Sequence, residues 1–311
     1  MFLVTFLIGL VMLVGGAHFL VEGGGRVAVG LRVPAMVVGL TIVAFGTSAP
    51  ELSVSVMAAL EASTAMAMSN VNGSNIANIF FVLGLAAMVH PLTVERSLLR
   101  RDIPTCIGLQ LLVILLALDG TFGRVDGVIV VLGGVFYNLW LLYDVRRGRA
   151  SLEDEVEAEG SLAVNVAKLV AGLVVLVLGA RLFVDAAVEA ARFLHFSDRM
   201  IGLTVVALGT SAPETAAALA AARKGEVDMA VGGSVGSNIF NIAMVLGITA
   251  CIAPIDLSSG GFLQDMGMAL VAALLLVGVV ARGGIFRSDG IVLVLVYIAY
   301  IALGVYQGMG A

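Results

Sequence analysis

Charged residues are scarce in this sequence. Asp, Glu, Lys and Arg make up 13% of its 311 residues, against roughly 25% in an ordinary soluble domain. Hydrophobic residues make up 60%. This balance excludes a soluble globular domain. The net charge of −5 carries little information, because the charges lie in loops, and we expect no nucleic-acid partner.

Cysteine and histidine, which hold soft metal ions in proteins, are also rare. The two cysteines, Cys106 and Cys251, lie in apolar surroundings, where a thiol behaves as a small core residue. The three histidines, His18, His90 and His195, form no metal-ligand spacing, and no His-Glu-x-x-His motif occurs. We therefore expect no cofactor, and the pattern does not favour an intramembrane protease or another enzyme.

The sequence is rich in long apolar runs, each long enough to cross a hydrocarbon core of about 30 Å. It predicts an all-α polytopic protein of a plasma or inner membrane, surrounded by lipid and expected to be a monomer. The first run lacks the basic segment of a signal peptide, so we expect a retained helix. Ten spans are predicted, at residues 1–22, 35–60, 65–90, 103–119, 126–145, 164–191, 200–222, 228–253, 262–281 and 288–308.

Two polar motifs interrupt the apolar runs, and each occurs twice. Gly-Thr-Ser-Ala-Pro-Glu stands at 46–51 and again at 209–214, an offset of 163 residues. Gly-Ser-Asn-Ile-Ala-Asn at 73–78 returns at the same offset as Gly-Ser-Asn-Ile-Phe-Asn at 236–241. The match needs no gap from residue 16 to beyond residue 126. The sequence therefore contains an internal duplication.

Each half contains five predicted spans, an odd number, so the second half must be inverted relative to the first. Inverted repeats are a recurring plan of secondary transporters, with the binding site at the membrane midplane. The predicted parts are a first repeat at 1–145, an acidic cytoplasmic linker at 146–163 and a second repeat at 164–311. In this plan helices 2 and 7 and helices 3 and 8 carry the motifs and form a central ion site.

Loop charge predicts the orientation, because cytoplasmic loops carry an excess of Lys and Arg. If both termini are external, the outer loops hold only Arg124, Arg192 and Arg199. The cytoplasmic loops then hold Arg26, Arg32, Arg96, Arg100, Arg101, Arg146, Arg147, Arg149, Arg223, Lys224, Arg282 and Arg287. We therefore expect external termini.

The doubled motifs supply the ligands that hard cations prefer. Pro50 and Pro213 each remove a backbone hydrogen bond from a helix and weaken it beside a glycine. Freed carbonyls, hydroxyls and carboxylates are ligands for Na⁺ and Ca²⁺. Inversion brings Glu51 and Glu214 together, and two buried carboxylates repel or protonate unless a cation lies between them.

At these motifs the sequence resembles the cation/calcium exchanger superfamily, and most closely its prokaryotic sodium/calcium exchanger branch. The likeness covers essentially the whole chain. It implies that Glu51 and Glu214 are central ligands shared by Ca²⁺ and Na⁺. The further ligands that it implies are Thr47, Thr210, Ser48, Ser211, Ser74, Ser237, Asn78, Asn241 and the carbonyls of Ala44 and Ala207.

One pair departs from the family pattern. Well-studied sodium/calcium members carry an aspartate at one of the positions that here are Asn78 and Asn241. The change removes one titratable group and up to one negative charge. It leaves the stoichiometry and the coupling ion open.

The expected function is a secondary active antiporter that exchanges Na⁺ for Ca²⁺ by alternating access. The resemblance suggests that the long first and sixth spans slide across a rigid core. The alternatives are a cation/proton exchanger in which Glu51 and Glu214 carry protons, and a cation channel. Nothing in the sequence resembles a repeated selectivity-filter loop.

Overall fold

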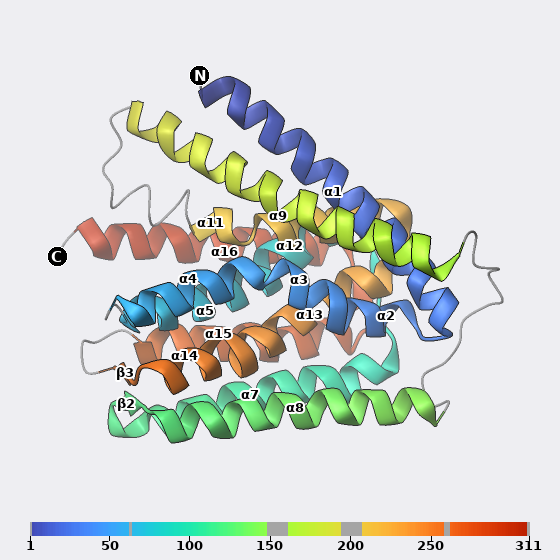
Figure 1. The fold of residues 1–311 in the computed structure, drawn as a ribbon. Helices are drawn as coiled ribbons and strands as arrows, with labels where there is room; N and C mark the ends of the chain where they lie inside the picture. Colours follow the sequence, from blue (N-terminus) through green and yellow to red (C-terminus); the bar gives the residue numbers. More distant parts are fainter. Residues whose placement is uncertain (1, 62–63, 148–160, 194–206, 258–261, 310–311) are drawn as a thin grey trace.

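The fold is almost entirely helical (Figure 1). A computed structural model describes residues 2–61, 64–147, 161–193, 207–257 and 262–309. In the first half the helices are α1 (Phe2–Leu31), α2 (Ala35–Val38), α3 (Ala44–Thr47), α4 (Ala49–Leu60), α5 (Thr64–Ala77), α6 (Leu83–Val89), α7 (Ile103–Leu116) and α8 (Arg124–Arg146). In the second they are α9 (Leu162–Phe193), α11 (Ala207–Thr210), α12 (Ala212–Lys224), α13 (Val227–Phe240), α14 (Gly247–Ile252), α15 (Phe262–Val280) and α16 (Arg287–Met309).

Short helical turns of other kinds interrupt or extend these helices. Wider π-helical turns are η1 (Gly39–Val43), η2 (Asn78–Val82), η3 (Leu98–Asp102) and η6 (Asn241–Leu246), and η4 (Ala117–Asp119) is a 3₁₀ turn. Because η2 joins α5 to α6 and η6 joins α13 to α14, each of these pairs runs as one continuous span.

Eight helical stretches in the described part of the chain are long and apolar enough to cross a membrane. A ninth is obtained when 35–47 and 49–60, which meet at a bend of 43°, are taken as one span. The first helix continues to Leu31, well beyond its predicted end at residue 22. Much of the predicted acidic linker and the start of the span predicted at 200–222 lie outside the described residues.

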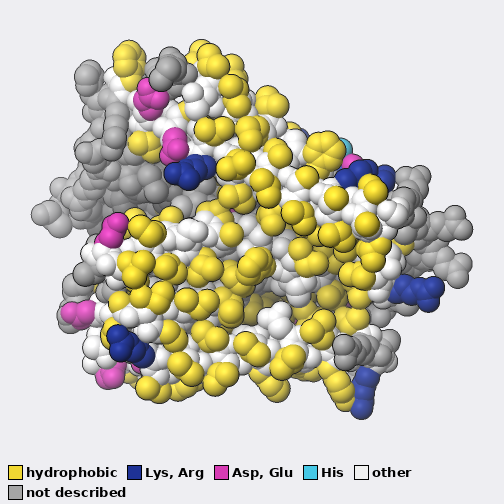
Figure 2. Space-filling model, viewed as in Figure 1, with side chains coloured by type: hydrophobic (Ala, Val, Ile, Leu, Met, Phe, Trp, Pro, Cys, Tyr) yellow, Lys and Arg dark blue, Asp and Glu magenta, His cyan; other side chains and the backbone are white. Residues whose placement is uncertain are grey.

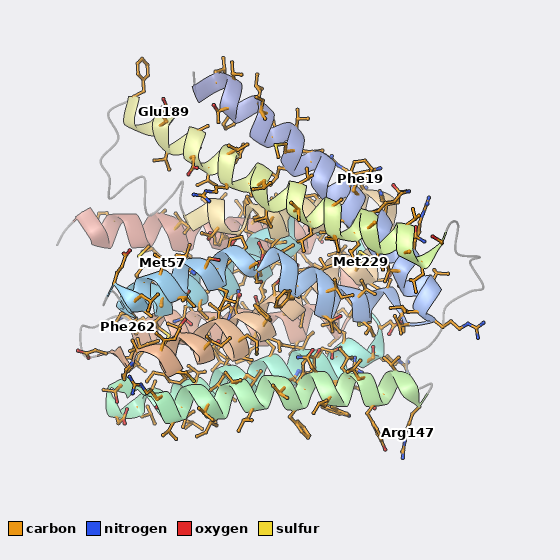
Figure 3. All side chains as sticks on the ribbon, in the orientation of Figure 1. Phe19, Met57, Arg147, Glu189, Met229 and Phe262 are labelled. Carbon is orange, nitrogen blue, oxygen red and sulfur yellow. The ribbon has the colours of Figure 1, made fainter. Side chains whose placement is uncertain are left out.

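The outer surface suits a lipid environment. Large apolar side chains are exposed along most of the long helices, among them Val11, Leu115, Leu132 and Val174. Figure 2 shows hydrophobic side chains across the middle of the visible face and charged ones mostly near its two ends. Arg147 and Glu189 lie at opposite ends of the molecule (Figure 3). An apolar band between polar ends is the surface of a membrane protein.

The helices α5 and α13 lie at the centre. In the most apolar window of 66–89, 78% of the residues are buried, and in that of 227–252, 72% are. In the other six single-helix spans of the described residues the share is 39% or less. The two spans that carry the Gly-Ser-Asn motifs are therefore enclosed by the others.

The helices α1 and α9 pack with their backbones in direct contact. A Cβ atom on Gly9 would come within 2.5 Å of the Phe183 nitrogen, and one on Gly23 within 2.5 Å of the Leu169 nitrogen. Gly16 lies against Leu176 in the same way. Glycines at seven-residue spacing let helices approach this closely in membranes. The pair crosses the other helices as a separate layer (Figure 1).

Two short antiparallel ladders join loops of the two halves. β1 (Leu92–Thr93) pairs with β4 (Gly284–Ile285), and β2 (Thr121–Phe122) pairs with β3 (Ile255–Asp256). The facing pairs are Leu92 with Ile285 and Phe122 with Ile255. Adding the sequence offset of 163 to 92 gives 255, and adding it to 122 gives 285. Each strand of one ladder therefore corresponds, in the other half of the chain, to a strand of the other ladder.

Candidate cation site

Each Gly-Thr-Ser-Ala-Pro-Glu motif forms a one-residue break between two helices. Ser48 separates α3 from α4 with φ −86° and ψ 6°, and Ser211 separates α11 from α12 with φ −86° and ψ 10°. The proline follows within the first two positions of the new helix, where its missing N–H costs nothing. The break therefore arises from the sequence itself.

The break places a carboxylate in the first turn of each new helix. Glu51 is the third residue of α4, which begins at Ala49, and Glu214 is the third residue of α12, which begins at Ala212. Both are buried, with exposed fractions of 0% and 4%. The unpaired N–H groups at a helix N-terminus favour negative charge nearby. They only partly offset the cost of burying the carboxylates at membrane depth.

Serine hydroxyls contact one oxygen of each carboxylate. Ser48 donates to Oε1 of Glu214 at 3.2 Å, a contact between the two halves. Ser74 donates to Oε1 of Glu51 at 3.5 Å, the long limit of a hydrogen bond. Among the described residues, Oε2 of either glutamate has no hydrogen-bond partner. Each carboxylate thus keeps an oxygen available to a cation.

The remaining hydroxyls lie in the same region. Thr47 contacts the Ser237 hydroxyl at 3.4 Å, again across the two halves, and also donates to the Ala44 carbonyl at 3.4 Å. The buried Ser211 hydroxyl finds no partner in the described part of the chain. Thr210 ends α11 and is half-buried.

Four asparagines link α5 and η2 to α13 and η6. Asn78 donates through Nδ2 to Asn238 Oδ1 at 3.0 Å, and Asn238 donates to the Asn75 main-chain carbonyl at 3.1 Å. Asn241 donates to Asn75 Oδ1 at 3.2 Å. Asn78 and Asn241 are the first residues of the π-helical turns η2 and η6. Such turns occur frequently at functional sites.

Five oxygen atoms of the predicted ligand set are buried and lack a hydrogen-bond partner within the described ranges. They are Glu51 Oε2, Glu214 Oε2, Asn78 Oδ1, Asn241 Oδ1 and Ser211 Oγ. Buried polar atoms normally have partners. An all-oxygen set of carboxylates, amides and hydroxyls is suited to Ca²⁺ and Na⁺.

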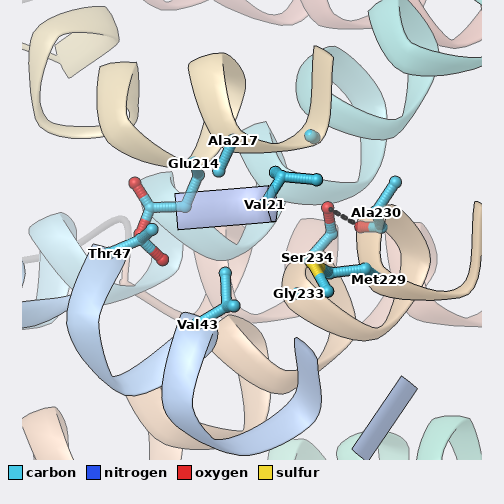
Figure 4. A pocket seen from close by; sticks show the side chains of 10 residues that line it. Val21, Val43, Thr47, Glu214, Ala217, Met229, Ala230, Gly233 and Ser234 are labelled. Atoms are coloured by element: carbon cyan, nitrogen blue, oxygen red, sulfur yellow. Dashed lines mark hydrogen bonds between the residues drawn. The ribbon is translucent and has the colours of Figure 1, made fainter. Parts of the chain in front are cut away.

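A small cavity lies beside one of the carboxylates. Thr47 and Glu214 line it at one side, and Met229 and Ser234 of α13 line it at another (Figure 4). Val21 of α1 forms part of the wall. The cavity therefore connects the site with the boundary between α1 and the central helices.

The structure thus brings most of the predicted residues together, although the sequence did not identify every contact. Ala44 is buried, and its carbonyl accepts from Thr47 and from the Ser48 N–H. Ala207 is the first residue of α11, and its side chain lies outside the described part. The contacts of Asn75 and Asn238 were not predicted, although both belong to the doubled motif. Asn70 was also missed, and it donates to the carbonyl of Glu51 at 3.2 Å.

Comparison with known sequences identifies the family. The pattern of the sodium/calcium exchanger protein family matches residues 1–143 and 164–306. This chain belongs to that family. Both matched segments include one copy of each doubled motif, so the resemblance seen in the sequence is confirmed.

Individual relatives extend over nearly the whole chain. The putative antiporter CaxA of Alkalimonas amylolytica is 38% identical over 306 residues, covering 94% of this chain and 95% of the relative. The sodium/calcium exchanger MaX1 of Methanosarcina acetivorans is 30% identical, covering 96% and 97%. The inner membrane protein YrbG of Escherichia coli is 36% identical, covering 86% and 85%.

A solved structure shows the same fold. The sodium-calcium exchanger NCX_Mj, soaked with 10 mM Na⁺ and no Ca²⁺, superimposes with a TM-score of 0.86 at 32% sequence identity. The match covers 97% of this chain and 98% of NCX_Mj. The helical membrane fold is therefore that of a sodium/calcium exchanger.

Proposed function

We propose that this protein is a secondary active antiporter that exchanges Na⁺ for Ca²⁺ across a cell membrane. Two buried glutamates surrounded by neutral oxygen ligands are the observation that carries the proposal. Family membership and the likeness to MaX1 and NCX_Mj support it.

Charge balance explains how such a site couples two cation fluxes. Glu51 and Glu214 together carry up to two negative charges in a region from which water is largely excluded. Each ionised carboxylate costs on the order of 2.5–3.5 kcal/mol at the centre of a membrane helix. One Ca²⁺ balances both charges, and Na⁺ ions balance them in larger number. The site therefore changes sides only when it is loaded, which links Ca²⁺ movement in one direction to Na⁺ movement in the other.

The proposed ligand set combines the two carboxylates with neutral groups from both halves. The unpartnered oxygens of Glu51, Glu214, Asn78 and Asn241 support their inclusion. The other members proposed are Thr47, Thr210, Ser48, Ser211, Ser74, Ser237 and the carbonyls of Ala44 and Ala207.

The proposed architecture is ten spans in two inverted repeats, 1–145 and 164–311, joined by an acidic cytoplasmic linker at 146–163, with both termini external. Two structural relationships support the repeats. The offset of 163 residues relates the strands of one β-ladder to the strands of the other. The asparagine pair Asn78–Asn238 becomes Asn241–Asn75 under the same offset, and both pairs are hydrogen-bonded.

For alternating access, we propose that α1 and α9 move together as one unit against the remaining helices. Their close backbone contact supports this. Sliding one helix along the other would bring residues with side chains to the places that glycines now occupy, where a Cβ atom would clash with the facing backbone. Val21 of α1 lines the cavity beside Glu214. A displacement of the pair therefore changes access to the carboxylate.

The decisive experiment is uptake of radioactive Ca²⁺ into proteoliposomes. Vesicles preloaded with Na⁺ are compared with vesicles preloaded with K⁺ or choline, and with vesicles under an imposed pH gradient. We expect uptake only with internal Na⁺, and an effect of a valinomycin-induced potential if the exchange moves net charge. Uptake driven by the pH gradient alone would replace this proposal with a cation/proton exchanger. Conductance far above exchanger rates would replace it with a channel.

A further inference from the structure

The four asparagines between the central helices are buried, with exposed fractions of 2% or less. Asn78 and Asn241 belong to the proposed ligand set, whereas Asn75 and Asn238 do not. The three hydrogen bonds among the four determine how the amides are oriented. An asparagine amide offers a cation its oxygen and repels it with its NH₂ group. Orientation therefore decides whether Asn78 and Asn241 can act as ligands.

The orientation of Asn78 is fixed by a relay that begins at a main-chain carbonyl. The Asn75 carbonyl can only accept, so the atom of Asn238 that faces it at 3.1 Å must be the NH₂ nitrogen. Asn238 therefore directs Oδ1 toward Asn78, 3.0 Å away, and Asn78 must present its own NH₂ group in return. The amide oxygen of Asn78 is left facing away from this bond, without a hydrogen-bond partner in the described part of the chain.

Reversing the Asn78 amide is costly. Its oxygen would then face Asn238 Oδ1 with no hydrogen between them. Asn238 cannot reverse in response, because its oxygen would face the Asn75 carbonyl. Each such reversal leaves buried polar atoms unpaired. The protein backbone thus determines which atom Asn78 presents.

The related pair Asn75–Asn241 is constrained differently. Asn241 donates to the side-chain oxygen of Asn75, and the Asn75 NH₂ group has no partner within the described ranges. If both amides reversed together, the bond would persist with donor and acceptor exchanged. Among the residues that the structure describes, no main-chain carbonyl accepts a hydrogen bond from either amide of this pair, as the Asn75 carbonyl does from Asn238.

We propose that Asn238 is a positioning residue for cation binding. It transmits the constraint of the Asn75 carbonyl to Asn78 and holds the Asn78 oxygen in the orientation of a ligand. Asn238 itself acts through Asn78. The inference rests on the proposed function, since it assigns a role within the same site.

A double-mutant cycle tests the relay. Ca²⁺ affinity is measured by calorimetry on purified protein, and apparent KM and Vmax are measured in proteoliposomes, for N78A, N238A and the double variant. We expect N238A to weaken Ca²⁺ binding about five- to tenfold, the loss expected for about one hydrogen bond, with Vmax within about twofold of wild type. In the double variant the affinity should match that of N78A alone, because the ligand through which Asn238 acts is already absent.

The matched control is N75A, the same substitution at the related position. It retains the main-chain carbonyl on which the relay depends. The fold-loss of Ca²⁺ affinity in the double variant N75A/N78A should therefore equal the product of the losses in the two single variants. The relay is wrong if the losses of Ca²⁺ affinity in N238A and N78A also multiply in the double variant, or if N238A leaves Ca²⁺ affinity unchanged. Should N238A fail to fold, N238S carries the same expectations while retaining a buried polar group. If the wild type binds Ca²⁺ without exchanging it, only the antiport proposal is overturned. The double-mutant cycle, measured as Ca²⁺ affinity, would still test the role of Asn238.

Discussion

Ser48 and Glu214, which lie in different halves of the chain, are joined by a hydrogen bond of 3.2 Å between the serine hydroxyl and Oε1 of the carboxylate. The offset of 163 residues relates Ser48 to Ser211, yet the Ser211 hydroxyl has no hydrogen-bond partner in the part of the chain that the structure describes. The two carboxylates are therefore held differently, although their sequence motifs are identical. Such asymmetry is consistent with a transporter that exposes one side of its site at a time.

Removing the Ser48 hydroxyl should weaken cation binding. In S48A, Oε1 of Glu214 loses its donor, and the carboxylate is less firmly oriented. We expect apparent KM for Ca²⁺ to rise by about tenfold or more, in line with the loss of a hydrogen bond to a charged group. Uptake kinetics in Na⁺-loaded proteoliposomes measure this change.

Ser53 provides the matched control for that substitution. It lies on the same helix, α4, but is exposed and donates to the Ala49 carbonyl at 3.0 Å. S53A should leave KM unchanged. If both variants shift KM equally, the effect comes from the helix rather than from the contact with Glu214.

The two buried glutamates should both be indispensable. E51Q and E214Q each remove one negative charge, so one Ca²⁺ is no longer balanced. We expect Na⁺-dependent Ca²⁺ uptake to fall to the level of empty vesicles, while size-exclusion profiles stay unchanged. The control is E189Q, because Glu189 is exposed near the end of α9 (Figure 3). Near-normal uptake in both E51Q and E214Q would remove these residues from the site.

The contact between α1 and α9 makes a prediction about two neighbouring glycines. A Cβ atom on Gly16 would clash with the backbone at Leu176, whereas one on Gly15 would meet nothing within 4 Å. G16A should therefore destabilise the protein by about 1–3 kcal/mol through overpacking. G15A should be neutral or slightly stabilising, because alanine favours helix. Thermal unfolding in detergent compares the two, and equal midpoints would contradict the close packing.

The sequence indicates candidate ligands but not the contacts between them. Carboxylates and prolines in apolar runs are costly, so Glu51 and Glu214 could be identified from their surroundings alone. Which serine meets which glutamate depends on how the two halves pack, and residue spacing within one helix does not contain that information. The π-helical turns that begin at Asn78 and Asn241 have no recognised sequence signal.

The predicted end of the first helix was wrong for a related reason. The predicted span 1–22 ends at Glu22, and a charge is costly within a membrane helix. In the structure α1 continues past it, because Glu22 accepts from Lys168 of α9 at 3.2 Å and pairs with Arg26 at 3.1 Å. Only the packing of α1 against α9 supplies the Lys168 partner. A hydropathy pattern is evaluated for each segment separately, so it cannot reveal a partner on another helix.

Ligand binding should also be visible as stability. A cation that binds the folded state and not the unfolded state stabilises it by about 2.7 kcal/mol at a concentration one hundred times its Kd. Because the two carboxylates repel each other when both are ionised, Ca²⁺ should raise the unfolding midpoint of the wild type. The same addition should leave E51Q and E214Q almost unchanged, while E189Q should respond like the wild type. Thermal unfolding at increasing Ca²⁺, with Mg²⁺ in parallel, measures this response independently of transport. A Ca²⁺-dependent rise of equal size in E51Q and E214Q would locate the stabilising cation elsewhere in the protein.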